Sequence, residues 1–349
     1  MQQHVYHLSH IDLDGYSCQY LTTQCFDKIE CYNANYGPEV TARLEEIVKK
    51  IEQDQFLSAS NTIEPLILVT DLNLTTKEAN WLEREAMRTG AKIQLLDHHA
   101  TGASTAEKFA WYKLDTSRSA TLITYEWLQK HYRFDIENKL SDIVKAVNAV
   151  DIWLSEDTLF EYGKVMLGMI SGAREVNRIL FPKQDRAFKL FMIEEAKKRV
   201  GNPDAPIALD DDLHQIKKNF FIEEKNNTKD NLVAYYVTNL LTREKQRLTI
   251  HYMGYKGILG YNVGNASIIG NNCMVQNPDY DFYMDVNFRG NFSLRSNNKM
   301  DVSKMAAQIG NGGGHPNASG GKIENYKDSF VYADVRKFIQ NYIDEKTAG

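Results

Sequence analysis

The triplet Asp97-His98-His99 directly follows the apolar run 92–96, which has the length and composition of a buried strand. A carboxylate and two imidazoles at the end of such a strand lose solvation unless each finds a polar partner or an ion. The fold must therefore bring further polar groups to the same place. Metal binding is the natural explanation, since acidic and histidine residues also follow the first predicted strand, at 10–14.

The first half of the chain alternates strand-like and helix-like segments. Such alternation is typical of a parallel sheet with helices on its faces, and it predicts an α/β fold. A capping-box sequence at 75–78 predicts the start of one of the helices. The predicted strands are 5–9, 29–34, 65–70 and 92–96, and the predicted helices include 15–26 and 43–51.

The second half changes character. Residues 119–199 have a mostly helical pattern, and a charged stretch over 210–247 predicts a long helix with a kink at Asn226-Asn227. Strands are predicted at 248–253, 257–261, 280–288 and 291–295, and helices at 301–309 and 328–343. We therefore expect three parts: a parallel-sheet domain over 1–200, a helical linker over 201–247 and a smaller α/β domain over 248–349.

Length and charge limit the classes of function. A chain of 349 residues can build two cores, and a net charge of −5 argues against binding of long nucleic acid through an extended basic track. The four cysteines form no CxxC pair, which favours reduced thiols over a zinc ribbon. No stretch has the pattern of a signal peptide or a membrane span, so we expect a cytoplasmic protein without membrane contact.

Acidic and histidine residues occur at the ends of four elements of the first domain. Three of the four groups follow strands, and the carboxyl ends of parallel strands line one crevice. Singly, Asp71 or Asp151 would be interpreted as a cap of a turn or helix. Together, the groups suit two Mn²⁺ or Mg²⁺ ions that activate water for attack on phosphorus, which predicts a dinuclear metallohydrolase. The six candidate ligands are His10, Asp12, Asp14, Asp71, His98 and Asp151.

The second predicted domain contains candidate anion-binding groups. Arg295 offers a planar fork for a phosphate, and the glycine run 312–314 lets backbone N–H groups approach an oxyanion beside His315. The alternative for the glycine run is a flexible surface turn. In the first domain, Arg118 either contacts a phosphate at a helix N-terminus or is solvated beside a capping serine at 117 or 119.

These motifs, taken in order, resemble those of the DHH phosphoesterase superfamily. The resemblance rests on the His-x-Asp-x-Asp-Gly sequence at 10–15, strand-end Asp71, the triplet 97–99 and helix-end Asp151. The segments 292–296 and 310–320 are similar to the substrate-binding DHHA1 domain that accompanies one branch of that superfamily. Together the motifs extend from residue 10 to residue 321.

The resemblance implies a role for each candidate ligand. His10 and Asp12 would hold one ion, and Asp71 would bridge the two ions. Many family members place the first histidine four residues before the first aspartate, whereas His10 lies two before Asp12, so His7 is the alternative ligand. The ligands of the other ion would be Asp14, His98 and Asp151.

The resemblance also implies catalytic and substrate-binding groups. Asp97 would orient a neighbouring histidine, and His99 would contact the scissile phosphate. The second domain would hold the far end of the substrate. The predicted substrate-binding residues are Arg295, Ser296, Gly313, Gly314 and His315, together with Arg118.

The function that the resemblance implies is hydrolysis of short oligoribonucleotides (nanoRNA) to mononucleotides, as in a nanoRNase-type exonuclease or oligoribonuclease. Two divalent ions would be the cofactors, with Mn²⁺ preferred over Mg²⁺. Alternatives are cleavage of a cyclic or linear dinucleotide (c-di-AMP or pApA type), removal of the 3′-phosphate from pAp, and pyrophosphate hydrolysis. A single-stranded-DNA exonuclease and a non-catalytic nucleotide-binding module rank lower. A homodimer is compatible with the sequence.

Overall fold

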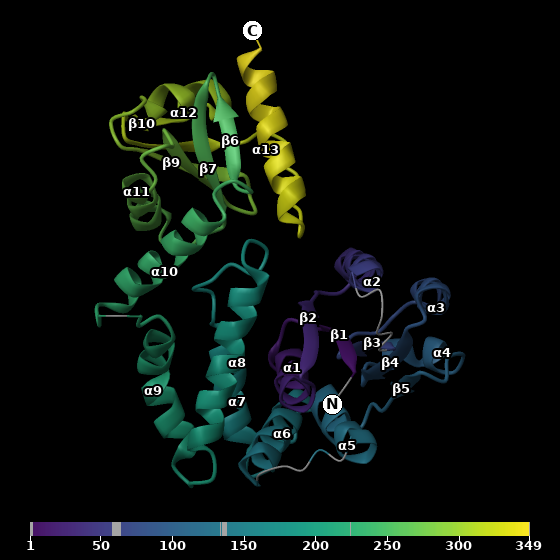
Figure 1. Ribbon diagram of the computed structural model, residues 1–349. Helices are drawn as coiled ribbons and strands as arrows, with labels where there is room; N and C mark the ends of the chain where they lie inside the picture. Colours follow the sequence, from purple (N-terminus) through teal and green to yellow (C-terminus); the bar gives the residue numbers. More distant parts are fainter. Residues whose placement is uncertain (1–2, 58–63, 133, 135–137, 224, 349) are drawn as a thin grey trace. The chain divides into compact units, whose positions relative to one another are not determined.

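A parallel five-stranded sheet lies at the centre of the first part of the chain (Figure 1). The computed structural model describes residues 3–57, 64–132, 134, 138–223 and 225–348. The strand order is β2-β1-β3-β4-β5, so the winding direction reverses between β1 and β3. Ligands bind at such a reversal, outside the carboxyl ends of the strands. The strands are β1 (His4–Ser9), β2 (Lys28–Asn33), β3 (Pro65–Thr70), β4 (Lys92–Asp97) and β5 (Tyr112–Leu114).

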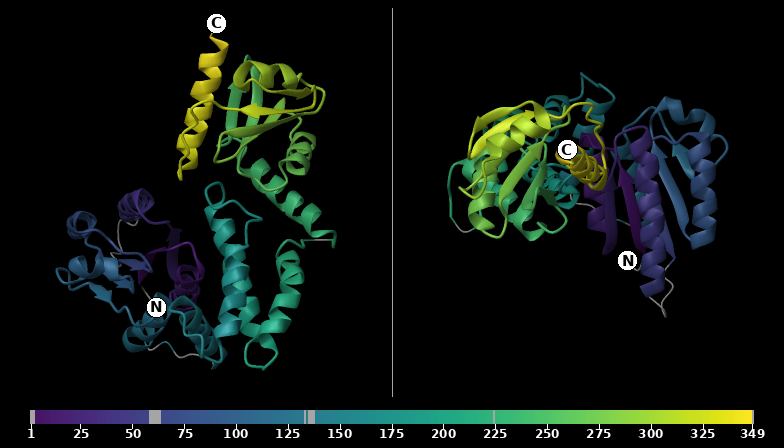
Figure 2. Two further views of the ribbon diagram at one scale, coloured as in Figure 1. Left: turned by 180° about the vertical axis from the view of Figure 1, so that it is seen from behind. Right: turned by 90° about the horizontal axis from the view of Figure 1, so that it is seen from above.

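Helices cover both faces of this sheet (Figures 1 and 2). On one face, Leu8 and Val69 pack in a buried cluster with Leu44 of α2 (Pro38–Leu57) and Leu82 of α3 (Thr76–Thr89). On the other face, α1 (Leu13–Cys25) packs against α5 (Ala120–Tyr132) and contacts β1. The predicted helix-covered parallel sheet is confirmed.

Local sequence explains how these elements begin. β3 is an unbroken, fully buried apolar segment, as strands covered on both faces require. Thr75 caps α3 in the predicted capping box, in which the Thr75 side chain and the Glu78 side chain each accept the other residue's backbone N–H. The remaining helices before residue 200 are α4 (Ala103–Ala106), α6 (Asn138–Asp151), α7 (Phe160–Ser171) and α8 (Pro182–Arg199).

The prediction of one long helix over 210–247 is wrong. The structure has two helices there, α9 (Ala205–Phe220) and α10 (Lys229–Arg243). Thr228 begins α10 as its N-cap, because its hydroxyl accepts the N–H of Asn231. The side-chain oxygen of Asn227 also accepts the N–H of Thr228. These residues therefore start a new helix instead of bending an existing one.

A six-stranded mixed sheet organises the C-terminal part of the chain, with the order β10-β11-β9-β8-β7-β6. Only β7 and β8 pair in parallel within it. Its strands are β6 (Thr249–Tyr252), β7 (Tyr255–Tyr261), β8 (Phe282–Val286), β9 (Asn291–Ser296), β10 (Gly313–His315) and β11 (Ala318–Lys322). Its helices are α11 (Ala266–Gln276), α12 (Val302–Gly310) and α13 (Tyr332–Thr347).

The chain forms two compact units. Unit 1 comprises Met1–Ala173 and Lys189–Leu213, and unit 2 comprises Arg174–Phe188 and His214–Gly349. Helices α8 and α9 are each divided between the units, so this grouping differs from the predicted parts 1–200, 201–247 and 248–349. Among the described residues, no helix combines the length and the apolar character that crossing a membrane requires.

Candidate metal centre

Asp71 lies at the centre of the candidate site, directly after β3. Its backbone has a φ of 57°, a left-handed conformation that is uncommon outside glycine and that aspartate adopts more readily than most residues. Its side chain lies between two histidines, with Oδ2 3.6 Å from Nδ1 of His10 and Oδ1 3.3 Å from Nε2 of His98. The residue is only 1% exposed, and Oδ2 has no hydrogen-bond partner among the described residues. Because a buried, unpaired carboxylate oxygen is costly, it marks a place for a cation.

One donor group lies on the β1 side of the site and includes Asp71 itself. The ligand atoms of His10, Asp12 and Asp71 all lie within 4.8 Å of one another. Asp12 is also the N-cap of α1: Oδ1 accepts the N–H of Gly15 at 3.0 Å, while Oδ2 lies 2.8 Å from Nδ1 of His10. Gly15 is needed at this turn, since a Cβ there would lie 2.4 Å from the His10 carbonyl oxygen.

A second donor group consists of Asp14, His98 and Asp151, whose ligand atoms also lie within 4.8 Å of one another. Nε2 of His98 lies 3.7 Å from Asp14 Oδ2 and 3.5 Å from Asp151 Oδ2. Asp14 is almost fully buried, and its carboxylate accepts the N–H groups of Ala120 and Thr121 at the N-terminus of α5. The helix terminus thus stabilises this carboxylate as an anion.

Asp97 and His99 form a separate pair beside these groups. Asp97 is fully buried, and its Oδ1 lies 2.7 Å from Nδ1 of His99 while its Oδ2 accepts the Tyr112 hydroxyl at 2.6 Å. Since a carboxylate only accepts, Nδ1 of His99 carries the proton, and Nε2 points to Tyr36. This arrangement fits the orienting role predicted for Asp97.

Tyr36 is a site residue that the sequence analysis missed. Its hydroxyl lies 2.8 Å from Nε2 of His99, and its ring centroid lies 4.5 Å from that of His10. The neighbouring Asn35 places its side-chain oxygen 3.4 Å from Nε2 of His10. Both residues follow β2, so the rule that strand ends share one edge could have identified them.

His7 does not join the donor groups. It is buried within β1, where Nδ1 lies 2.8 Å from the Thr22 hydroxyl and Nε2 lies 2.8 Å from the Thr70 hydroxyl. Both of its ring nitrogens therefore have protein partners. The structure brings His10 to the cluster despite its short spacing from Asp12.

The electrostatics of the cluster indicate a missing positive charge. Burial raises the pKa of Asp14 and of Asp71 above the ordinary range, and burial together with Asp14 raises the pKa of Asp151 to about 8. Burial alone would lower the pKa of His10, but the hydrogen bond with Asp12 and the nearby carboxylate of Asp71 raise it to about 10. Four carboxylates and two imidazoles around an unpaired oxygen are a donor set that fits hard divalent cations.

The predicted substrate-binding residues of unit 2 lie on β9 and β10. Arg295 donates to the Ser267 hydroxyl at 2.5 Å and to the Leu294 carbonyl at 2.7 Å. Ser296 is buried, and its hydroxyl donates to the Asp281 carbonyl within the sheet. His315 is exposed. Their roles in substrate binding stay a prediction.

The glycine run is not the loop that the sequence suggests. Gly313, Gly314 and His315 form β10, which pairs with β11 in an antiparallel hairpin. Gly314 has a φ of 143°, and a Cβ there would lie 2.6 Å from the Ala318 carbonyl oxygen. The close approach of two strands therefore accounts for this glycine.

Arg118 is engaged by acidic neighbours. Its guanidinium donates through two nitrogens to Asp115 and also pairs with Glu126. The phosphate contact predicted for Arg118 would have to compete with these ion pairs.

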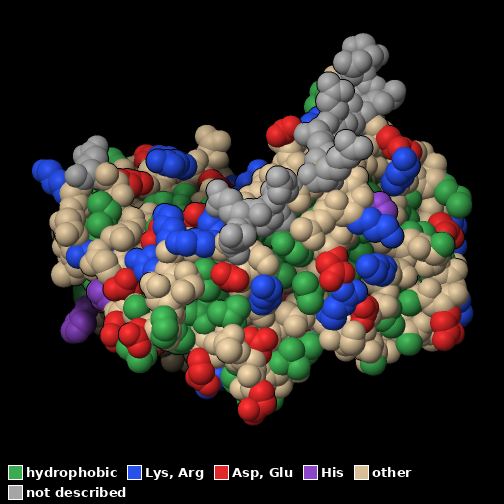
Figure 3. Space-filling view, turned by 90° about the horizontal axis from the view of Figure 1, so that it is seen from below, with side chains coloured by type: hydrophobic (Ala, Val, Ile, Leu, Met, Phe, Trp, Pro, Cys, Tyr) green, Lys and Arg blue, Asp and Glu red, His purple; other side chains and the backbone are tan. Residues whose placement is uncertain are grey.

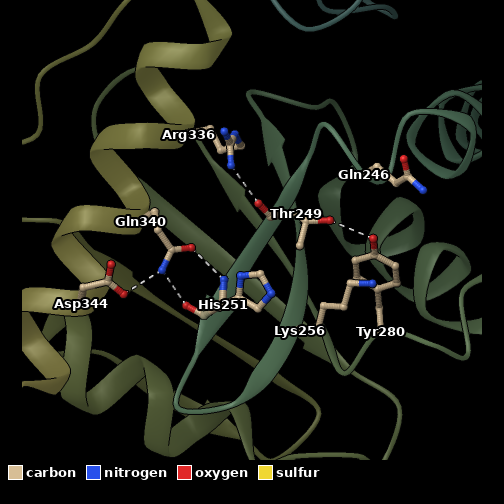
Figure 4. Close-up of a pocket in the computed structure, with 8 residues that line it drawn as sticks. All are labelled: Gln246, Thr249, His251, Lys256, Tyr280, Arg336, Gln340 and Asp344. Atoms are coloured by element: carbon tan, nitrogen blue, oxygen red, sulfur yellow. Dashed lines mark hydrogen bonds between the residues drawn. The ribbon is translucent and has the colours of Figure 1, made fainter.

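A pocket of about 650 Å³ opens in unit 2 between β6 and α13 (Figure 4). The Gln340 amide bonds to both the N–H and the carbonyl of His251, so it covers part of the edge of β6. None of the predicted substrate-binding residues is among the lining residues. These are Gln246, Thr249, His251, Lys256, Tyr280, Arg336, Gln340 and Asp344.

Comparison with known proteins agrees with this arrangement. Residues 279–345 match the DHHA1 domain family. The chain is 45% identical over 346 residues to a 3′,5′-cyclic-nucleotide phosphodiesterase of Helicobacter pylori, covering 96% of this chain and 97% of that protein. It is 26% identical over 331 residues to oligoribonuclease NrnB of Bacillus subtilis, covering 91% and 73%. A crystal structure of an uncharacterized protein from Helicobacter pylori G27 superposes with a TM-score of 0.90 at 44% identity, covering 98% and 99%.

The fold, the candidate metal-binding groups and the two relatives together define a hydrolase that acts on phosphoester bonds. The chain belongs to the DHH/DHHA1 superfamily, as the sequence motifs predicted. Enzymes of this superfamily depend on metal ions.

Proposed function

We infer that this chain hydrolyses the 3′,5′-phosphodiester bond of small nucleotides, with 3′,5′-cyclic mononucleotides as the first substrate class. The observation that carries the proposal is Asp71, whose unpaired buried oxygen lies between two groups of carboxylate and imidazole donors. The substrate class is supported by the 45% identical relative, which is named for activity on cyclic nucleotides.

In this proposal two divalent ions, Mn²⁺ before Mg²⁺, are held by the donor groups around Asp71. When bound, such ions polarise a phosphate and lower the pKa of water. The chain's own residues then orient the phosphate. His99, held by the buried Asp97 carboxylate, presents its Nε2 edge beside Tyr36, where it can contact a phosphate oxygen.

Short oligoribonucleotides are the second candidate substrates, favoured by the NrnB relative and by the DHHA1 match. Arg295 and His315 would bind the terminal phosphoryl group of such a substrate. The net charge of −5 supports short substrates over long strands. On the face drawn in Figure 3, Lys and Arg side chains lie among Asp and Glu side chains instead of forming one continuous basic track.

A substrate panel with purified protein and Mn²⁺ tests this function. The panel contains 3′,5′-cyclic AMP and GMP, RNA of two to five nucleotides, c-di-AMP, pApA, pAp and pyrophosphate. We expect the highest kcat/KM on cyclic mononucleotides, and no product from any substrate when a chelator is present. Release of mononucleotides from RNA alone would replace the first candidate with the second. Failure to cleave any 3′,5′-phosphodiester would contradict both.

A matched pair of variants on α6 links activity to the site. Asp151→Asn removes a proposed ligand, and Asp142→Asn changes a carboxylate on the same helix outside the donor groups. We expect a loss of about 10²-fold or more in kcat/KM for the first variant, since ligand loss disrupts the orientation of the site, and little change for the second.

A further inference from the structure

A second cluster of metal-binding side chains lies at the opposite ends of the strands from the candidate metal centre. His4 is the first residue of β1, whereas His10 follows the end of that strand. His4, Glu30 of β2 and Asp54 of α2 offer one nitrogen and two carboxylate oxygens within 4.8 Å of one another. All three belong to unit 1.

Hydrogen-bond geometry determines which nitrogen of His4 carries the proton. The Tyr6 hydroxyl lies 2.7 Å from Asp54 Oδ2 and 2.9 Å from His4 Nδ1. A phenol has one proton, and a carboxylate can only accept, so Tyr6 donates to Asp54. Nδ1 of His4 must then donate to the Tyr6 oxygen. In the neutral ring, this leaves the lone pair on Nε2.

The protonation states agree with this assignment. Burial raises the pKa of Tyr6 far above its ordinary value, so its proton stays in place. Burial would raise the pKa of Asp54, but hydrogen bonds from Lys50 and Tyr6 lower it.

Nε2 of His4 is therefore a buried acceptor without a donor. His4 is 5% exposed, and within the part of the chain that the structure describes Nε2 has no hydrogen-bond partner. Its nearest charged atom is Oε1 of Glu30 at 3.5 Å, which is a second acceptor. Two acceptors that face each other repel unless a cation lies between them.

Lys50 supplies only part of the missing charge. Its ammonium lies 2.7 Å from Asp54 Oδ1 and 3.4 Å from Glu30 Oε1, so its ion pairs are with the carboxylates and leave the imidazole unpaired. The side chain is 34% exposed and carries its charge on a flexible stem. A divalent ion could displace it into solvent at small cost. The partial exposure of Glu30, also 34%, gives an ion a path of entry.

We propose that His4, Glu30 and Asp54 bind a Zn²⁺ ion that is separate from the candidate metal centre and links β1, β2 and α2. Zn²⁺ binds histidine nitrogens and aspartate or glutamate oxygens, and sites with three protein ligands keep water in the remaining position. The ion would stabilise unit 1 without contact with the substrate.

Metal analysis and diffraction locate this ion directly. Protein dialysed against Zn²⁺ is analysed for bound metal, and crystals soaked in Zn²⁺ are measured on both sides of the zinc absorption edge. We expect an anomalous peak beside Nε2 of His4, in addition to peaks at the candidate metal centre. Peaks at the candidate metal centre alone would overturn the proposal, and they would leave the proposed function intact.

Variants test the same point in solution. His4→Gln and Glu30→Gln should each bind one Zn²⁺ fewer per chain than the wild type, with unchanged kcat/KM in Mn²⁺. His214→Gln, which removes an exposed histidine, is the control for adventitious binding and should keep the wild-type stoichiometry. If His4→Gln lowers the melting temperature equally with and without Zn²⁺ and binds as much metal as the wild type, His4 has only a structural role and the proposal fails.

Discussion

Asp71 carries several structural costs at one position. Its backbone is left-handed, its carboxylate is buried, and one oxygen has no hydrogen-bond partner in the described parts of the chain. Strain of this kind costs about 1–3 kcal/mol and persists where the surrounding structure enforces it, most often at functional sites. The residue is thus suited to ion binding and unfavourable for the stability of the metal-free fold.

Asp71→Asn should separate the contribution of Asp71 to ion binding from its cost to the stability of the metal-free fold. Without metal we expect the variant to be more stable by about 1–2 kcal/mol, since it removes the cost of burying an ionisable carboxyl group. In Mn²⁺ it should lose at least about 10²-fold in kcat/KM, because the carboxylate predicted to bridge the two ions is absent. Denaturant unfolding and steady-state kinetics measure the two quantities. Full activity with intact folding would remove Asp71 from the site.

Asp285 is a buried carboxyl of unit 2 that lies outside the candidate metal centre. Burial raises its pKa from 3.8 to about 7, although the N–H of Val263 and the Tyr283 hydroxyl both lie near its Oδ1. Between about pH 4 and pH 7 the unfolded chain has lost this proton and the folded chain has kept it. Stability therefore decreases as pH rises through this window, and the loss is complete above the folded pKa.

Asp285→Asn should remove this pH dependence. The amide cannot ionise, so the variant should gain stability over the wild type as pH rises from 4 to 7, by about 1.4 kcal/mol for each unit of pKa shift. Unfolding by urea at a series of pH values measures the difference. The exposed Asp344→Asn is the control. A constant difference at all pH values would contradict the raised pKa.

At the scale of elements, the turn from β1 into α1 delivers two members of one donor group and one member of the other. His10, Asp12 and Asp14 all lie on this turn or in the first turn of the helix, and Asp12 caps the helix while facing His10. The N-terminus of α5 in turn holds Asp14. The site therefore depends on how closely the turn passes over the end of the strand.

Gly15→Ala tests this dependence. A Cβ at Gly15 would meet the His10 backbone, so either the turn or the helix must shift. We expect a loss of about 1–3 kcal/mol in stability together with a lower kcat/KM. Gly168→Ala in α7 is the matched control: a Cβ there meets nothing within 4 Å, and it should add about 0.5–1 kcal/mol. Equal effects of the two substitutions would show that the turn tolerates a side chain.

At the scale of the whole molecule, tryptophan reports on only one unit. The chain has four tryptophans, and all lie in unit 1, as do the candidate metal ligands. They are Trp81, Trp111, Trp127 and Trp153. Tryptophan fluorescence therefore follows unit 1, whereas far-ultraviolet circular dichroism follows both units.

Metal removal should affect the two signals differently. Ligand binding to the native state stabilises it by about 2.7 kcal/mol at a concentration 100 times the dissociation constant. We therefore expect a chelator to lower the melting temperature detected by tryptophan. The circular dichroism signal also contains the unfolding of unit 2, and the midpoint of that contribution should stay unchanged. An unchanged tryptophan transition in excess chelator would argue against ion binding in unit 1.

The sequence by itself determined the parallel sheet, its helices and the six candidate ligands, because apolar periodicity and strand-end positions are local signals. Only the tertiary structure decided which of His7 and His10 joins the cluster, that Tyr36 faces His99, and that the glycine run is a strand. These outcomes depend on which side of a strand faces a neighbour and on how closely distant segments approach. Side-chain pairing across the sheet is a property of the packed chain, so residue type and spacing alone do not specify it.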